Sequence, residues 1–469
     1  MVFRSLDRRQ ASLGPVSPMH TDPLAKYRDE RLPRYTSYPT APHFSPEVAA
    51  SQYGAWLASL DDRGSTGSLY LHVPFCRSMC WYCGCHTTIT KHDAPILDYL
   101  SVMRREIETV AVRLGRRLPV SHIHFGGGTP TIMKPDELAS LVEMLADRFA
   151  LQPDTEIAVE IDPRTLTPAM TATLGRVGVT RASLGVQSFD PIVQRAINRV
   201  QTVTQTANAV NGLRAAGVAG INFDLIYGLP HQTIQSCQDT VAACLEMAPD
   251  RFAVFGYAHI PSFKKRQRMI DESTLPDGEA RFAQAEAIGA ALQAAGYVRI
   301  GLDHYARRSD PIVEAQRRRR LRRNFQGYTT DTADALIGFG ASAIGRLPQG
   351  YVQNAVGLGD YGPRVLEGGL ATTKGYVLTT DDRLRADLIE RIMCDFAVDV
   401  GSVARQHAVD PAAIFHRLPR LATLQADGLV ERCGHEIRIR PSSRHLVRTV
   451  ASAFDAYLES PTRTFSRAV

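Results

Sequence analysis

Short runs of apolar and β-branched residues recur between residues 68 and 257, at intervals that leave room for a helix between them. Two of the intervening segments, 96–114 and 135–149, carry apolar side chains at helical spacing. Because strands that alternate with helices form parallel βαβ units, the pattern predicts a wheel-like α/β sheet of six units. The predicted strands are 68–75, 121–126, 156–162, 181–187, 220–227 and 251–257, and a run at 296–305 is expected to extend the sheet.

The pattern changes after about residue 370. Helical segments at 381–395, 410–426 and 443–458 surround a short hairpin near 430–439, which is typical of a winged-helix-like module and would ordinarily suggest DNA binding. Residues 1–18 are polar, lack periodicity and are expected to be disordered. The predicted domains are an N-terminal arm at 1–60, an α/β domain at 61–365 and a mainly helical domain at 366–469.

Composition adds modest limits on function. The chain has 469 residues, of which 44% are hydrophobic and 22% charged, as in ordinary soluble globular proteins. No apolar run approaches the ~18 residues that a transmembrane helix needs. The eight cysteines and the lack of an export-signal pattern indicate reduced thiols in a cytoplasm. The net charge of +6 is compatible with an anionic substrate.

Four cysteines lie within ten residues and form the most informative motif. Cys76, Cys80 and Cys83 have the spacing C-x3-C-x2-C, and Cys85 follows two residues later. The run 69–73 precedes them, so they are expected on a loop just past a strand's C-terminal end, where parallel sheets bind ligands. Thiolates select zinc, copper(I) or iron–sulfur clusters. Three of them can hold three irons of a [4Fe–4S] cluster and leave the fourth iron open to a ligand.

Two alternatives stay open at this point. A zinc site could recruit His72 or His86, although structural zinc usually takes two separated ligand pairs. A disulfide is disfavoured by the expected reducing compartment.

Polar residues at later strand ends extend the candidate site. Gly126–Gly128 follow the second predicted strand, with a spacing wrong for a dinucleotide motif. Glu160 ends the third strand, Gln187 the fourth, and Asp224 lies within the fifth. A buried acid in a strand is costly without a partner. A ribose or a sulfonium could be that partner, and an internal salt bridge is the alternative.

The motifs together resemble the oxygen-independent coproporphyrinogen III oxidase family of the radical S-adenosylmethionine superfamily. C-x3-C-x2-C with Tyr82 before the third cysteine is the superfamily signature, and the other motifs specify the family. The resemblance runs from about residue 31 to residue 469. Its segments are PRYTSYPTAPHF at 33–44, SLYLHVPFCRSMCWYCGCHT at 68–87, HFGGGTPT at 124–131, EIDPR at 160–164, GVQSFD at 185–190, NFDLIYGLP at 222–230, NFQGYTT at 324–330 and FSRAV at 465–469.

The resemblance implies an incomplete (β/α)6 radical-SAM barrel, open on one side, with the C-terminal module as a lid. It implies a [4Fe–4S] cluster held by Cys76, Cys80 and Cys83, with Cys85 near the site as a non-ligand. A fourth ligand or a structural thiol is the alternative role for Cys85. Two S-adenosylmethionine molecules are implied as cofactors, and Tyr70 and Cys85 are the expected catalytic residues. The expected cofactor contacts are Tyr70, Tyr82, Gly127, Gly128, Thr129, Glu160, Gln187, Arg199, Asp224, Ala258 and Ile344.

The implied reaction converts two propionates of coproporphyrinogen III to vinyl groups in haem biosynthesis. The implied partners are this substrate and a reductant such as flavodoxin or ferredoxin, with no nucleic acid, and the chain is expected to be a monomer. A haem-binding chaperone and a radical methyltransferase of the same superfamily are the alternatives. Candidate propionate anchors are Arg34, Lys264, Lys265 and Arg266.

One segment departs from the family pattern. Six arginines occupy seven positions, at Arg317, Arg318, Arg319, Arg320, Arg322 and Arg323. They could capture the anionic substrate or an acidic electron carrier, and a solvated face or a nucleic-acid patch is the alternative.

Overall fold

The computed structural model describes residues 24–28, 30–60 and 64–458. The tail expected to be disordered at 1–18 and the FSRAV motif at 465–469 lie outside these residues. Within them, each helix is too short or too polar to cross a membrane.

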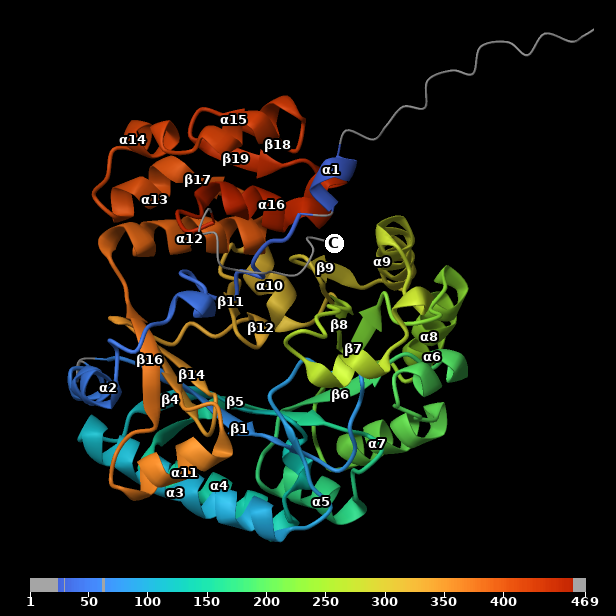
Figure 1. Cartoon of the computed structure of the whole chain (residues 1–469), viewed down its shortest axis with the longest axis vertical. Helices are drawn as coiled ribbons and strands as arrows, with labels where there is room; N and C mark the ends of the chain where they lie inside the picture. Colours follow the sequence, from blue (N-terminus) through green and yellow to red (C-terminus); the bar gives the residue numbers. More distant parts are fainter. Residues whose placement is uncertain (1–23, 29, 61–63, 459–469) are drawn as a thin grey trace, which may run out of the picture.

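Six parallel strands form the centre of the molecule, as the sequence predicts. They pair in chain order within one sheet, and helices follow each of them (Figure 1). The strands are β1 Gly67–Val73, β4 Pro119–Gly127, β5 Ala150–Ile161, β6 Arg181–Gln187, β7 Gly220–Tyr227 and β8 Arg251–Gly256. The helices after them are α3 Ala94–Leu114, α4 Pro135–Arg148, α5 Pro168–Arg176, α6 Pro191–Ala196 with α7 Val203–Ala215, α8 Ile234–Glu246 and α9 Gly278–Ala294.

The sheet continues at both edges to twelve strands. On one side β13 (Ala335–Phe339) pairs parallel with β1, and β14 (Ile344–Leu347), β15 (Gly350–Asn354) and β16 (Thr372–Val377) follow antiparallel. The strand expected at 296–305 is two short antiparallel strands, β9 (Val298–Ile300) and β10 (His304–Ala306), which form the other edge. β16 belongs to this sheet although it follows the boundary expected at 365.

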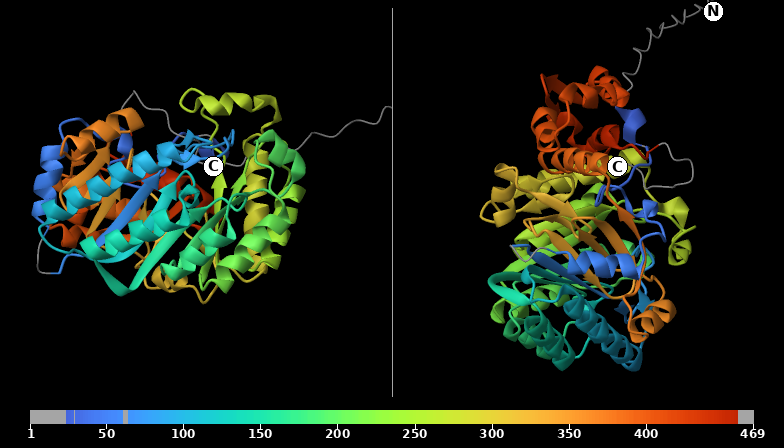
Figure 2. Two further views of the ribbon diagram at one scale, coloured as in Figure 1. Left: turned by 90° about the horizontal axis from the view of Figure 1, so that it is seen from below. Right: turned by 90° about the vertical axis from the view of Figure 1, so that its left-hand side faces the viewer.

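The main core lies between the parallel strands and their helices. Alternate side chains of β1 (Leu69, Leu71 and Val73) are buried against apolar residues of α3 such as Leu100 and Met103. Figure 2 shows the helices spread along the outer side of the curved sheet. Burial of this apolar surface stabilises the barrel and leaves the strand ends and the inner face for the site.

The C-terminal region forms a second core, at the top of Figure 1. Its helices are α12 Thr380–Asp395, α13 Val400–Gln406, α14 Pro411–His416, α15 Pro419–Ala426 and α16 Val447–Ala451. Three short strands, β17 Ala397–Asp399, β18 Val430–Cys433 and β19 Glu436–Ile439, pair antiparallel. Helices next to a small sheet agree with the predicted module.

Two helix predictions in this region are wrong in detail. The helix expected at 410–426 breaks before Pro419, because the residue preceding a proline avoids helical geometry. The helix expected at 443–458 is a short α16 between 3₁₀ turns at Pro441–Leu446 and Ser452–Phe454. Val447, Thr449 and Val450 are β-branched and buried, so packing on all sides sets this segment's conformation more than helical preference does.

The N-terminal arm joins the two regions. It contains α1 (Ala25–Arg28), a 3₁₀ turn at Ala41–His43 and α2 (Ala50–Ala58). Tyr27, Tyr35 and Tyr38 are buried in the C-terminal core, and the Arg448 guanidinium donates hydrogen bonds to the carbonyls of Leu32 and Pro33. The remaining elements are β2 Phe75–Cys76, β3 Thr88–Ile89, α10 Pro311–Arg317, β11 Arg322–Asn324, β12 Gly327–Thr329 and α11 Leu358–Leu366, with 3₁₀ turns at Pro130–Ile132, Lys265–Met269 and Glu272–Thr274.

Candidate active site

The cysteine loop begins directly after β1, as predicted. Cys76 lies in β2, and its thiol is 3.4 Å from the Thr87 hydroxyl, which donates, and 3.5 Å from the Thr129 hydroxyl. Thr129 comes from the loop after β4, so neighbouring strand ends meet at this thiol. Burial raises the pKa of the Cys76 thiol, and these two hydroxyl contacts offset only part of that effect.

Cys80 faces two guanidinium groups. Arg164 Nη2 and Arg199 Nη1 each donate to its sulfur at 3.6 Å. Asp162 pairs with both arginines, at 2.7 Å from Arg164 and 3.4 Å from Arg199. Arg199 also donates to the Gly185 carbonyl at 2.6 Å. This buried network places two positively charged groups beside the Cys80 sulfur.

Cys83 and Cys85 form a hydrogen-bonded pair with opposite pKa shifts. The bond from Cys85, together with the charges of Arg266 and Lys264, lowers the pKa of the Cys83 thiol to about 6. The same bond raises the pKa of Cys85 well above its ordinary value. Cys83 and Cys85 therefore lie in different electrostatic surroundings, and the roles of ligand for Cys83 and non-ligand for Cys85 stay predictions. The surroundings of Cys76, Cys80 and Cys83 fit an iron–sulfur cluster on this loop.

The glycines after β4 are required by close contacts. A Cβ on Gly128 would lie 2.5 Å from the Phe75 carbonyl oxygen, and one on Gly127 would lie 2.7 Å from the His72 ring. Gly127 also has a φ of 111°, which favours glycine. These residues let the ends of β4 and β1 approach each other beside the cysteine loop.

Glu160 is held at the end of β5 by its neighbours. It accepts hydrogen bonds from the Gly127 N–H at 3.1 Å and from His124 Nε2 at 3.2 Å. Burial opposes ionisation, but the His124 and Gly127 bonds outweigh it, so the pKa of Glu160 is lowered. An ionised carboxylate therefore stands beside the glycine segment, able to accept hydrogen bonds from a ligand.

Asp224 lies on the inner face of the sheet and accepts bonds from Ser183 Oγ at 3.0 Å and Asn222 Nδ2 at 2.9 Å. Burial and the charge of Glu160 raise its pKa to about 6. Glu160 and Asp224 line the same cavity of about 190 Å³. Asp224 has no basic partner within 4.0 Å in the described chain, so the salt-bridge alternative does not apply to it there.

Tyr70 and Tyr82 occupy different sides of the cysteine loop. The Tyr70 hydroxyl is 2.9 Å from His72 Nδ1, and its ring stacks on His124 at 5.8 Å between centroids. The Tyr82 carbonyl accepts a bond from Gln267 Nε2 at 2.9 Å, and the same amide donates to the Ala258 carbonyl at 3.0 Å. Gln267 thus ties the loop to the segment that carries Ala258.

Gln187 and Ile344 lie at the two flanks of the site. Gln187 ends β6 with a φ of 68° and is buried. Ile344 begins β14 after a tight turn whose Gly340 N–H donates to the buried Glu106 at 2.7 Å.

Glu106 also accepts bonds from Asn354 at 2.6 Å and Tyr361 at 2.7 Å. Burial raises its pKa to about 7.

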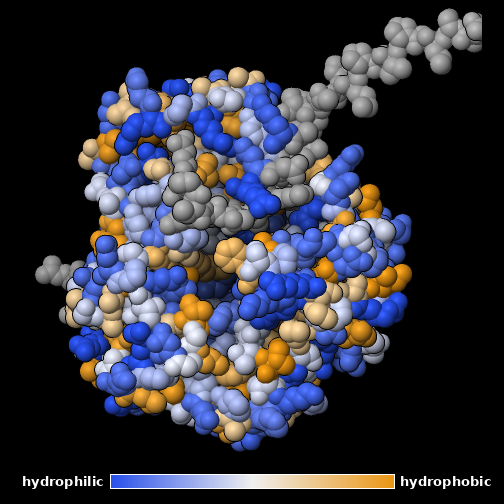
Figure 3. All heavy atoms as spheres, in the orientation of Figure 1, coloured by the Kyte–Doolittle hydropathy of each residue, from blue (hydrophilic) through white to orange (hydrophobic). Residues whose placement is uncertain are grey.

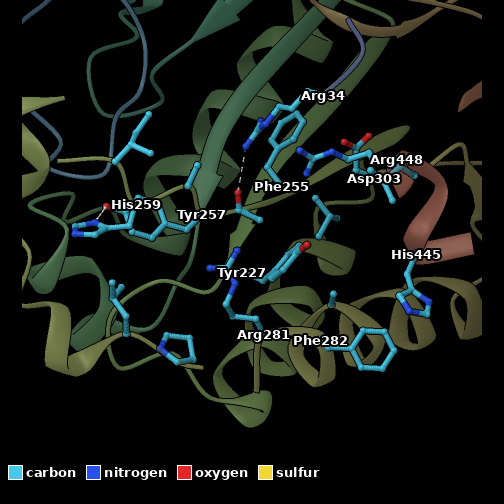
Figure 4. A pocket seen from close by; sticks show the side chains of 18 of the residues that line it. Arg34, Tyr227, Phe255, Tyr257, His259, Arg281, Phe282, Asp303, His445 and Arg448 are labelled. Carbon is cyan, nitrogen blue, oxygen red and sulfur yellow. Dashed lines mark hydrogen bonds between the residues drawn. The ribbon is translucent and has the colours of Figure 1, made fainter. Parts of the chain in front are cut away.

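A larger cavity of about 680 Å³ opens at the ends of β7 and β8, near Ala258. In Figure 4, Arg34 and Arg448 lie close together near Phe255 and Asp303, with Arg281 further away beyond Tyr227. Burial and the charges of Arg34 and Arg323 lower the pKa of Arg448 to about 9, which shows how crowded the cations are. The arginines that line this cavity are Arg31, Arg34, Arg281, Arg299, Arg323 and Arg448.

The arginine run divides between this cavity and the surface. Arg323 is buried, stacks over the Tyr328 ring at 4.4 Å and lies 4.0 Å from Asp303. Its Nε and Nη1 atoms are buried without a hydrogen-bond partner in the described chain. The others are exposed, and Arg317 and Arg318 pair with Glu314. Lys264, Lys265 and Arg266 lie outside the lining of this cavity.

Sequence reasoning missed several residues that shape the site. Asp162 and Arg164 belong to the EIDPR segment, from which the sequence predicts only Glu160 as a site residue. Their alternation along the end of β5 was an available signal, since Glu160 and Asp162 point to the same face. Thr87 and Gln267 act through hydrogen bonds to other segments of the chain, which no sequence pattern predicts.

The fold and the cysteine loop define a radical S-adenosylmethionine protein, and the Radical SAM superfamily profile matches residues 70–244. The chain belongs to the oxygen-independent coproporphyrinogen III oxidases: it is 59% identical to the one of Bradyrhizobium diazoefficiens over 451 residues, covering 96% of this chain and 100% of the relative. It is 41% identical to that of Paracoccus denitrificans, covering 92% and 95% of the two chains.

A solved structure agrees with this assignment. Coproporphyrinogen III oxidase (HemN) from Escherichia coli, described as a radical SAM enzyme, superposes with a TM-score of 0.87 at 36% identity. The match covers 92% of this chain and 100% of that one. These similarities favour the oxidase over the haem-chaperone and methyltransferase alternatives, and confirm the predicted fold class of a partial barrel with a helical C-terminal region.

Proposed function

We propose that this chain catalyses the oxygen-independent oxidative decarboxylation of coproporphyrinogen III to protoporphyrinogen IX. Two propionate side chains become vinyl groups. Each loses one hydrogen atom, carbon dioxide and one electron, and the electron passes to an external acceptor. The observation that carries the proposal is the arginine-lined cavity at the ends of β7 and β8, since the substrate bears four propionates and the arginine fork suits carboxylates.

We assign Cys76, Cys80 and Cys83 as ligands of a [4Fe–4S] cluster. When bound, the cluster and S-adenosylmethionine supply the 5′-deoxyadenosyl radical that removes the hydrogen atom. Hydroxyl groups contact the Cys76 thiol and guanidinium groups contact the Cys80 thiol, which suits sulfur ligands of a metal cluster. Cys85 is assigned, with Tyr70, to the substrate side of the site as a non-ligand.

The cofactor pocket is assigned to residues at neighbouring strand ends. Glu160 and Gly127 are hydrogen-bonded to each other and lie beside Tyr70, while Asp224 shares the inner cavity with Glu160. The Arg199 guanidinium donates a hydrogen bond to the Cys80 sulfur. Ala258 and Ile344 are assigned to the same site, and we propose that it binds two S-adenosylmethionine molecules, one for each propionate that reacts. The remaining assigned contacts are Tyr82, Gly128, Thr129 and Gln187.

The C-terminal module is assigned as the lid of the substrate cavity. Arg448 and His445, from this module, line the cavity together with Arg34 of the N-terminal arm. Figure 3 shows the face of the molecule hollowed between this module and the barrel. We further propose a cytoplasmic monomer, in keeping with eight cysteines that are all free thiols in the described chain.

Anaerobic turnover tests the proposal. The protein with reconstituted cluster is mixed with coproporphyrinogen III, S-adenosylmethionine and a chemical reductant, and porphyrin products, carbon dioxide and 5′-deoxyadenosine are measured. We expect a divinyl product and about one 5′-deoxyadenosine per vinyl group. A methylated product, or tight haem binding without turnover, would contradict the proposal.

A further inference from the structure

The segment from Phe263 to Met269 lies against the outer side of the cysteine loop. Its buried residue, Gln267, is 1% exposed and makes three hydrogen bonds: it accepts from the Ile260 N–H at 2.6 Å and donates to the carbonyls of Tyr82 and Ala258. Arg266 adds a bond to the Thr87 carbonyl at 3.2 Å. Thr87 in turn donates to the Cys76 thiol. A single residue, Thr87, therefore connects the segment to a cysteine of the loop.

The basic residues of this segment carry uncompensated charge. Lys264, Lys265, Arg266 and Arg268 have no carboxylate within 4.0 Å in the described chain, whereas Arg317, Arg318, Arg319 and Arg322 of the other basic run each pair with a glutamate. A cluster of unpaired cations produces a local positive potential that attracts acidic partners.

Exposed apolar side chains accompany these charges. Phe263 is 70% exposed and Met269 57% exposed, and Met79 of the cysteine loop is 36% exposed. Aromatic residues, methionine and arginine are enriched at protein interfaces. Phe263, Lys264, Lys265, Arg266, Arg268 and Met269, here called the basic surface, thus combine the features of a protein-binding site.

We propose that the basic surface docks an acidic one-electron carrier protein. The inference rests on the proposed function, which requires one external electron for each S-adenosylmethionine cleaved. The carrier is oxidised by one electron, which enters at the cysteine loop, and no atom is transferred. The exposed positions of Lys265 and Arg268 suit a broad protein contact, and none of the six residues lines the arginine-rich cavity that would hold the substrate.

Charge reversal at the exposed cations tests this proposal. The variant Lys265→Glu with Arg268→Glu is compared with Arg308→Glu with Arg320→Glu, which changes charge equally at exposed arginines beside α10. Binding of a purified acidic flavodoxin is measured by calorimetry at low and high salt. 5′-Deoxyadenosine formation is measured with reduced flavodoxin and, separately, with dithionite.

We expect the first variant to weaken flavodoxin binding at least about tenfold at low salt, with a smaller effect at high salt. Its dithionite-driven activity should equal that of the unchanged protein, and the control should bind flavodoxin normally. A second variant, Phe263→Ser, should weaken binding at both salt concentrations.

Three outcomes overturn the proposal. The first is unchanged flavodoxin binding both in the Lys265→Glu, Arg268→Glu variant and in Phe263→Ser, and the second is no flavodoxin binding by the unchanged protein. The third is a raised KM for coproporphyrinogen III with normal flavodoxin binding, which would show that these cations bind propionates instead. Absence of 5′-deoxyadenosine with dithionite in the unchanged protein would instead contradict the proposed function itself.

Discussion

The Glu160 carboxylate accepts a hydrogen bond from the backbone N–H of Gly127, 3.1 Å away, and this bond joins the end of β5 to the glycine segment after β4. A side chain that both orders the glycine segment and faces a cavity with Asp224 is well placed to bind S-adenosylmethionine. We expect Glu160→Ala and Asp224→Ala to weaken cofactor binding by ~1–3 kcal/mol, the scale of a lost charge-assisted hydrogen bond. Calorimetric titration at constant iron content checks this, and unchanged isotherms in both variants would relegate the acids to structural roles.

The cysteines give a sharper test. Replacing Cys76, Cys80 or Cys83 with Ser should abolish the cluster, because each thiol is expected to hold one iron, and cofactor cleavage should cease. Cys85→Ser should retain about four irons and four sulfides per chain while turnover falls. Iron and sulfide analysis after anaerobic reconstitution provides the measurement. Loss of iron from the Cys85 variant would make that residue a ligand.

Steric contact around the glycine segment predicts a contrast between two glycines. A Cβ on Gly128 would come within 2.5 Å of the Phe75 carbonyl oxygen and 2.7 Å of the Phe75 nitrogen, whereas a Cβ on Gly84 meets nothing within 4 Å. Gly128→Ala should therefore displace the start of the cysteine loop, lower the melting temperature and reduce the iron bound. Gly84→Ala, between Cys83 and Cys85, should leave both properties nearly unchanged. Equal behaviour of the two variants would refute the steric argument.

Glu106 predicts a pH dependence of stability. Its pKa in the folded chain is about 7, compared with an ordinary value of 4.5, because burial disfavours the charged form. The folded state therefore retains a proton that the unfolded chain loses, and this contribution is fully present below pH 4.5 and lost as pH rises through 7. Glu106→Gln cannot ionise, so its melting temperature relative to that of the unchanged protein should rise between pH 5 and pH 7.5. Parallel pH profiles of the two proteins in differential scanning calorimetry would show that the carboxyl does not titrate in this range.

The buried Arg323 offers a test of substrate binding. The Nε and Nη1 groups of Arg323 have no hydrogen-bond partner among the described residues and lie in a cavity with five other arginines. Arg323→Met should therefore raise the KM for coproporphyrinogen III about tenfold or more, since hydrogen bonds to charged groups contribute ~1.5–3 kcal/mol. Arg320→Met, at an exposed position of the same run, should not change it. Steady-state kinetics with iron content held equal separates the two. A normal KM for the Arg323 variant would leave the whole run without a role in substrate capture.

The sequence predicts the parallel half of this fold well, because β1, β4, β5, β6, β7 and β8 are long apolar runs separated by amphipathic helices. It does not predict where β13 joins. Ala335–Phe339 pairs with β1 across more than 260 residues of chain, and such non-local pairing leaves no local pattern. The breaks around Pro419 and α16 show the same limit on a smaller scale.

The site divides in a similar way. Spaced motifs point to the cysteines, the glycines and Glu160, since these residues act through backbone geometry or through their order along a strand. The Asp162 network and the Gln267 bridge depend on side chains that meet only after folding. The arginine run illustrates the opposite error: six similar residues look equivalent in sequence, but burial separates Arg323 from its exposed neighbours.

The contact of Arg448 with the carbonyls of Leu32 and Pro33, 415 or more residues apart, has a consequence for how the protein is made. The arginine-lined cavity is walled by both of these distant segments. During synthesis the barrel strands emerge and can fold long before residue 448 leaves the ribosome. Until then the N-terminal arm lacks its contact with Arg448. A nascent or prematurely terminated chain would thus lack one wall of this cavity, and the complete cavity, the proposed site of the porphyrinogen, would form only at the end of translation.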